Sequence, residues 1–193
     1  TIVALDSPSR LVDTRVSGGR FGSSSTSGVS VLRLKVAGAT TVKGVASGLP
    51  SSGVGAVAMN VTVVDGKDKD GYGFVTVYPC ASDSTPVPDA SNLNFAGGQT
   101  VPNSVLAPLS ADGYVCFSVY GDTHLLVDVS GYVPAGTGLT ALDSPKRLVD
   151  TRAVGGRFGS SSASGVSVLR LKVAGATTVK GAASGLPSSG GGA

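Results

Sequence analysis

The chain repeats itself after 137 residues, and this feature constrains what it can fold into more than any other. Residues 4–56 recur as residues 141–193, and only six of these 53 aligned positions differ, namely positions 9, 16, 17, 26, 45 and 54 of the first copy. Because an internal period defines the unit that folds, the expected folding unit is 137 residues long. We therefore expect residues 1–137 to form one complete module and residues 138–193 to be an incomplete second copy.

The residue content favours strands and turns over helices. The chain has 29 glycines, no tryptophan and one methionine, and all 12 of its acidic residues are aspartates. Valine and threonine favour strands, while glycine and aspartate disfavour long helices. The sequence has no run of 18 apolar residues, so no membrane span is expected.

Short apolar runs with a period of two, bounded by Gly, Pro, Ser and Asp, predict about nine strands. The expected ranges are Ile2–Leu5, Arg10–Thr14, Val29–Val36, Ala56–Val64, Gly73–Tyr78, Asn92–Phe95, Thr100–Leu109, Tyr114–Val119 and His124–Val129. Dipeptides such as Asp70-Gly71 and Asp112-Gly113 predict tight turns. The pattern predicts an all-β fold, an antiparallel β-sandwich of which the jelly roll is one form. A loop is expected at Ser17–Gly28, and a short helical turn near Ala39–Lys43 is an option.

Charge divides the chain into three segments. Residues 1–56 (the first basic half) carry six Lys/Arg and two Asp, residues 57–137 (the acidic half) carry two Lys and eight Asp, and residues 138–193 (the second basic half) carry seven Lys/Arg and two Asp. The net charge of +3 therefore reflects one surplus basic half. Because no lysine-rich tract or basic–aromatic pattern occurs, nucleic acid is not an expected partner. Either basic half could complete the acidic half, so residues 57–193 are an alternative folded unit, with 1–56 donated to a neighbouring molecule.

The two cysteines lie in the acidic half. A single pair in a β-rich chain favours a Cys80–Cys116 disulfide and an oxidising, extracellular setting. The bridge would stabilise the module by ~3–4 kcal/mol on the chain-entropy model. Two buried free thiols are the alternative.

The densest charge cluster is the motif Arg10-Leu-Val-Asp13-Thr-Arg15. Arginine forms planar, bidentate pairs with carboxylates, so the motif predicts an ion-pair clamp that pins a short edge strand. Binding of a carboxylate or sugar acid is the alternative interpretation. With its repeat, the expected clamp comprises Asp6, Arg10, Asp13, Arg15, Asp143, Arg147, Asp150 and Arg152.

Metal and catalytic sites are weakly represented. Asp65, Asp68 and Asp70 are weak calcium candidates, because the spacing lacks the full acidic loop and two lysines intervene. A solvated hairpin tip is the favoured interpretation. His124 is the only histidine and no G-x-S-x-G motif occurs, so we expect neither an enzyme nor a cofactor.

Aromatic residues are concentrated in the acidic half and supply the remaining candidate for a binding face. Core packing is the commoner use of such residues in strands, and an exposed cluster would favour glycan binding. The set comprises Tyr72, Phe74, Tyr78, Tyr114, Phe117, Tyr120 and Tyr132.

Six motifs follow one another in a fixed order along the 137-residue unit, and this order resembles that of a known module. These motifs are Leu5–Arg15, Asn60–Val63, Val75–Cys80, Ser91–Phe95, Gly98–Asn103 and Thr123–Tyr132. The series resembles a module strung along large secreted and surface proteins of actinobacteria and related bacteria. The resemblance implies an extracellular, β-rich repeat without catalytic residues to transfer.

The sequence therefore predicts a structural repeat module of an extracellular stalk, fibre or filament on a bacterial surface. Its expected partners are adjacent modules or identical chains. The alternative is a carbohydrate- or cell-wall-binding module that tethers a secreted protein to polysaccharide, which predicts an exposed aromatic cluster or a dependence on calcium.

Overall fold

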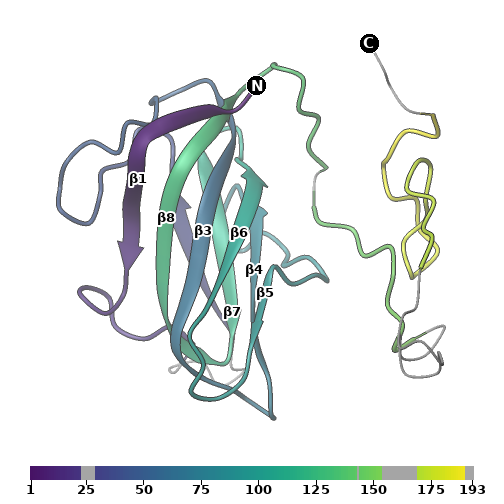
Figure 1. Cartoon of the computed structure of the whole chain (residues 1–193), viewed down its shortest axis with the longest axis horizontal. Coiled ribbons are helices and arrows are strands. Elements are labelled where there is room, and N and C mark those ends of the chain that lie inside the picture. The colour runs from purple at the N-terminus through teal and green to yellow at the C-terminus, as the bar shows by residue number, and fades with distance from the viewer. Residues whose placement is uncertain (23–28, 143, 154–168, 190–193) are drawn as a thin grey trace, which may run out of the picture. The chain divides into compact units, whose positions relative to one another are not determined.

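Strands with alternating apolar residues pair into two layers (Figure 1). The computed structural model describes residues 1–22, 29–142, 144–153 and 169–189. In these residues there are eight strands: β1 (Val3–Asp13), β2 (Val29–Lys35), β3 (Val54–Lys67), β4 (Gly73–Pro79), β5 (Leu93–Phe95), β6 (Val101–Pro108), β7 (Tyr114–Tyr120) and β8 (Asp122–Pro134).

The strand order is that of an eight-stranded jelly roll. One sheet has the order β1-β8-β3-β6 and the other has the order β2-β7-β4-β5. Every strand pair is antiparallel. Non-neighbouring strands in the sequence therefore lie side by side in each sheet, as in two interlocked Greek keys. The prediction of an all-β antiparallel sandwich is confirmed.

The core lies between the two sheets and follows the period of two in the sequence. In β3, Met59, Val61 and Val63 are buried and the residues between them are half-buried. In β7, Val115, Phe117 and Val119 are fully buried. Successive side chains of a strand point to opposite faces, so each strand sends every second residue into the core.

The first two predicted strands are one strand, which corrects the expected number from nine to eight among the described residues. β1 continues through Pro8 with register shifts against β8 between Ala4 and Ser9 and between Arg10 and Val12. An edge strand tolerates a proline, because one of its sides needs no amide donors. Because β1 is irregular between Ala4 and Val12, the sequence pattern does not show that it is one continuous strand.

The segment near Ala39–Lys43 forms a turn and no helix. The Thr41 amide donates to the Val45 carbonyl oxygen (2.8 Å), and an isolated bridge joins Thr40 and Ala46. Of the loop expected at Ser17–Gly28, residues 23–28 lie outside the described residues.

The Asp70-Gly71 turn is formed as predicted. Both residues have positive φ angles, 56° and 86°, and Lys69 and Tyr72 exchange two backbone hydrogen bonds. This is the geometry of a two-residue hairpin whose central residues are left-handed, for which Asp-Gly is favoured.

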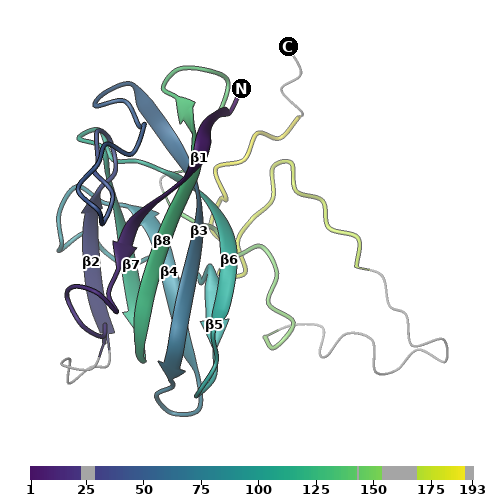
Figure 2. The same cartoon turned by 60° about the vertical axis from the view of Figure 1, so that its left-hand side comes forward.

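The first basic half supplies one edge strand to each sheet. β1 is an edge of the first sheet and β2 is an edge of the second. Figure 2 shows both strands on the same side of the sandwich. The other six strands come from the acidic half, except that β3 begins at Val54, so the first basic half closes one side of a six-stranded remainder.

The chain divides into two compact units, Thr1–Ser144 and Pro145–Ala193. The described residues of the second unit contain no strand, although they repeat the sequence of the first basic half. Their one regular backbone pairing is an isolated bridge between Thr177 and Ala183.

Candidate functional site

Several ion pairs join the first basic half to the acidic half. We call this contact the seam. It is defined by three arginines of the basic half and the aspartates that they meet, in the pairs Arg10–Asp128, Arg20–Asp65, Arg20–Asp122 and Arg33–Asp112. The opposite charges of the two halves therefore meet across the structure.

The first part of the seam lies at the end of β1. Arg10 and Asp128 are direct partners in the β1–β8 pairing. Arg10 donates from Nε to Asp128 Oδ1 (2.7 Å) and from Nη2 to Asp128 Oδ2 (2.9 Å). Two parallel charge-assisted bonds fix both distance and orientation, so this pair holds β1 in register on β8.

Asp13 joins the same cluster from the last residue of β1. It accepts from Arg15 at both carboxylate oxygens (2.8 and 2.7 Å) and from Arg10 Nη1 (3.2 Å). The hydrogen bond from Arg15 is the main cause that lowers the pKa of Asp13 to about 2, against an opposing effect of burial. The carboxylate is nearly inaccessible to solvent, at 5% exposure, and it stays ionised because its charge is paired.

Two residues of the predicted clamp differ from the expectation. Asp6 is exposed in β1 and forms no ion pair with Arg10 or Arg15. Its place is taken by Asp128, which the sequence did not single out for this role. Asp143 lies outside the described residues.

Arg20 forms the second part of the seam. Its Nε donates to Asp122 Oδ1 (2.6 Å), and its Nη1 donates to Asp65 Oδ2 (2.9 Å). Asp122 begins β8 and Asp65 lies near the end of β3. The Phe21 amide also donates to the Thr123 carbonyl oxygen (2.7 Å). One short segment of the basic half thus ties two strands of the acidic half together.

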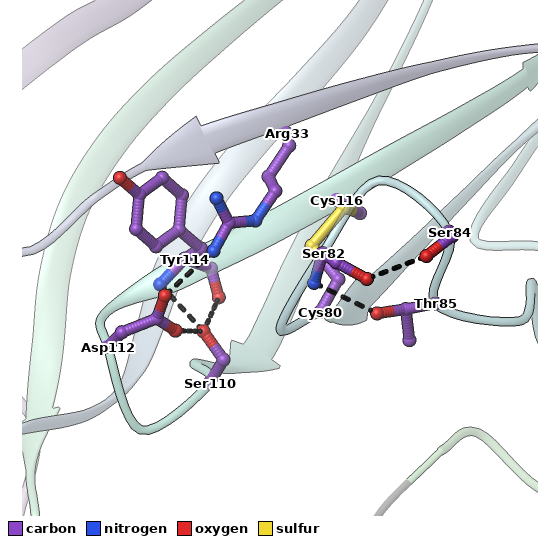
Figure 3. Close-up of a disulfide and its surroundings, with 9 residues drawn as sticks. All are labelled: Arg33, Cys80, Ser82, Ser84, Thr85, Ser110, Asp112, Tyr114 and Cys116. Atoms are coloured by element: carbon purple, nitrogen blue, oxygen red, sulfur yellow. Dashed lines mark hydrogen bonds and ion pairs between the residues drawn. A yellow bond between two sulfur atoms is a disulfide. The ribbon is translucent and has the colours of Figure 1, made fainter.

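Arg33 forms the third part of the seam on the outer face of the second sheet, as Figure 3 shows. Its guanidinium lies over the ring of Tyr114, 3.5 Å from the centroid, and its Nη2 donates to Asp112 Oδ2 (2.7 Å). Ser110 donates to the other oxygen of Asp112 (2.5 Å), and this bond is the main cause that lowers the pKa of Asp112. A cation held against an aromatic face and a carboxylate fixes β2 to β7.

The predicted disulfide between Cys80 and Cys116 is confirmed (Figure 3). It ties the end of β4 to the middle of β7, beside Arg33, which is the β2 partner of Cys116. Tyr78 is buried with the two cysteines, and this burial raises the pKa of its hydroxyl. The bridge therefore fixes β4 to β7, the strand with which β2 pairs.

The three calcium candidates have separate partners. Asp65 accepts from Arg20 (2.9 Å), Asp68 accepts from the Gly97 amide (3.1 Å), and Asp70 accepts from the Tyr120 hydroxyl (2.8 Å). No group of three carboxylate, imidazole or thiol ligands converges within the described residues.

A row of aromatic rings lies on the outer face of the second sheet. Phe74 and Tyr120 are cross-strand partners on β4 and β7, with ring centroids 5.3 Å apart. Tyr72 stacks on Tyr120 (5.3 Å) and is 53% exposed. The hydrogen bond from Tyr120 to Asp70 raises the pKa of that tyrosine to about 12. We call Tyr72, Phe74 and Tyr120 the aromatic row.

The second basic half repeats the local Asp–Arg cluster at the end of β1. Asp150 accepts from Arg152 (2.9 and 2.6 Å) and from Arg147 (3.4 Å), as Asp13 does from Arg15 and Arg10. The same bonds with Arg152 hold the pKa of Asp150 at about 2. The residue that would pair with Arg147 across strands belongs to an acidic half.

No family model, curated protein or solved structure matches this chain. Among the described residues there is no helix long and apolar enough to cross a membrane.

Proposed function

We propose that the chain is a stretch of a structural repeat array, an extracellular stalk, fibre or filament in which each jelly-roll module supplies length and stiffness. The observation that carries the proposal is the distribution of differences between the two copies. The described differing positions of the first copy are exposed (16, 17 and 45) or half-buried (9 and 54), and position 26 lies outside the described residues. The buried residues and the seam arginines of the copied segment are identical.

The core and seam residues are identical in the two copies, as expected for a protein whose copies must all fold in the same way.

The linker between copies supports the same proposal. β8 ends at Pro134 and the aligned repeat begins again at residue 141, so few residues separate successive modules. Short linkers restrict the relative motion of neighbouring domains. The disulfide fits an oxidising environment such as the cell exterior.

Negative-stain electron microscopy of a protein carrying four consecutive 137-residue modules tests the proposal. We expect straight rods whose length grows in proportion to the number of modules. A matched protein with a 20-residue Gly/Ser linker in place of each natural linker is expected to form separate beads. If both proteins show flexibly connected beads, the array does not supply stiffness and the proposal fails.

A second candidate is a module that binds carbohydrate or cell wall, and the aromatic row favours it. Three stacked rings, one of them 53% exposed, offer an apolar face to a sugar ring. Binding to immobilised polysaccharides, measured for the intact chain and for Tyr72→Ala, tests this candidate. Binding that disappears in Tyr72→Ala supports it, whereas the absence of binding to every polysaccharide leaves the structural role.

A further inference from the structure

The second basic half keeps the loop of the first, and its described residues on either side of that loop form no strand. In the first copy, the Gly38 amide donates to Pro50 and the Val42 amide donates to Arg10, at 2.8 and 2.9 Å. In the second copy, the Gly175 amide donates to Pro187 and the Val179 amide donates to Arg147, at 2.7 and 3.0 Å. The loop and the segment that corresponds to the end of β1 are therefore connected in both copies.

The second basic half also exposes residues that the first copy places against the acidic half. Val36 is fully buried, and its counterpart Val173 is 49% exposed. Leu32 and Leu34 pack against the core, and their counterparts Leu169 and Leu171 are 51% and 43% exposed. In the first copy, the residues at these three positions are covered by the sandwich to which the acidic half contributes six strands.

The acidic half supplies the matching surface. It presents β8 with Asp128 and β7 with Phe117, which pair with Arg10 and Leu32 of the first copy. The second copy has Arg147 and Leu169 at the corresponding positions. The side chains that set the register and the charge pairing in the first copy are therefore also present in the second.

The chain path also allows the second copy to reach β8. Val3 pairs with Tyr132 at the end of β8, and the counterpart of Val3 is Thr140, only eight residues after Tyr132. Gly136 and Gly138 both have φ angles of +77°, and Thr137 donates to the Pro134 carbonyl oxygen (2.6 Å). This segment already contains the left-handed residues that a hairpin loop needs.

A hairpin from Tyr132 to Thr140 is a short connection, so pairing of the second copy with β8 carries no large loop-closure cost. One difference between the copies favours the first copy on β8. Ser9 donates to the Ser47 carbonyl oxygen (2.9 Å), and the second copy has Lys146 in place of this serine.

We propose that the acidic half is an exchange site at which the second basic half of the same chain replaces the first. Pro145–Asp150 takes the place of Pro8–Asp13 on β8, and Leu169–Lys172 takes the place of Leu32–Lys35 on β7. The first copy occupies the site in the intact chain. The second copy takes over when contacts of the first are weakened. This inference does not depend on the proposed fibre function.

Hydrogen exchange with mass spectrometry on the full chain tests the exchange, because residues 9 and 146 differ and distinguish peptides from the two copies. In Arg10→Ala, which removes the pair with Asp128, we expect amides 147–150 to gain at least ten-fold protection while amides 10–13 lose it. The matched variant Arg147→Ala is expected to keep the wild-type pattern. If amides 10–13 lose protection and amides 147–150 gain none, the proposal is overturned.

A second pair of variants covers the case in which Arg10→Ala changes too little. Val36→Asp places a charge at a fully buried position. If exchange occurs, Val36→Asp remains folded by circular dichroism, and Val36→Asp/Val173→Asp unfolds. Equal unfolding of the single and double variants would contradict exchange.

Sedimentation at two concentrations separates exchange within one chain from exchange between chains. We expect Val36→Asp to remain a monomer at both concentrations. If it folds only as a dimer, the second basic half acts on a neighbouring molecule, and the proposal of exchange within one chain is wrong.

Discussion

The two basic halves have nearly identical sequences but lie in different surroundings. Paired with the acidic half, the first forms β1 and β2 and buries Val36 completely. The described part of the second forms no strand, and Val173 is 49% exposed. Both halves form the same loop and the same Asp–Arg cluster. Local sequence therefore determines the turns and local ion pairs, whereas strand formation depends on a partner distant in the sequence.

The largest expected effect comes from removing part of that partner. Phe117 is fully buried in β7, and Leu32 of β2 is its strand partner. Phe117→Ala should lower the free energy of unfolding by about 4 kcal/mol, because a large side chain leaves a cavity. In the NMR spectrum, residues 32–35 should shift while residues 169–172 do not. Equal shifts in both copies would show that the second copy already contacts β7.

Removing the disulfide should lower the free energy of unfolding by a similar amount, through the entropy of the unfolded chain. Closing the loop between Cys80 and Cys116, 36 residues apart in sequence, restricts the unfolded chain. On the chain-entropy model, Cys80→Ser/Cys116→Ser should lower the free energy of unfolding by about 3–4 kcal/mol in urea titrations. The hydrogen bonds around Gly175 should persist, since they need no acidic half. If the double variant lost the hydrogen bonds around Gly175 as well as stability of the sandwich, the local structure of the second copy would depend on the acidic half, contrary to our expectation.

Acid should weaken the first copy through Asp13. Its pKa is about 2 when folded, below its ordinary value of 3.8, so its pairing stabilises the fold above pH 3.8 and this stabilisation is lost as the pH falls towards 2. Because Arg15 is 45% exposed, solvent screening reduces the expected loss to about 1 kcal/mol. Urea titrations at pH 5 and pH 2.5 measure it, with Asp13→Asn as the matched control. An equal loss in Asp13→Asn would assign the acid effect to other carboxylates.

The smallest effect is expected at the cation–aromatic contact. Tyr114→Leu removes the ring under Arg33 and keeps an apolar side chain. The expected loss is about 0.5–1 kcal/mol, because the contact is partly open to solvent. Tyr114→Phe, which keeps the ring, is the control and should retain wild-type stability. A loss of the same size in both variants would assign the effect to the hydroxyl.

The features that sequence predicted are those with local signals. Alternation located the strands, Asp70-Gly71 located a hairpin turn, and the single cysteine pair located the disulfide. The divided charge also indicated that the halves attract each other.

The residues that sequence missed at the seam act over long separations. Arg20 meets Asp122 across 102 positions and Arg33 meets Asp112 across 79, and neither lies in a recognisable motif. Asp6 was expected in the clamp because it is near Arg10 in sequence, yet Asp128 holds that place through strand pairing. Without the jelly-roll order, no rule selects one of eight aspartates for each arginine.

Backbone NMR of the intact chain shows directly whether a basic half forms strands only against an acidic half. We expect strand-type chemical shifts and slow amide exchange at Leu32–Lys35, and coil shifts and fast exchange at Leu169–Lys172. The turns at Thr40–Ala46 and Thr177–Ala183 should have matching shifts. Strand-type shifts at both Leu32–Lys35 and Leu169–Lys172 in the same molecule would contradict this expectation.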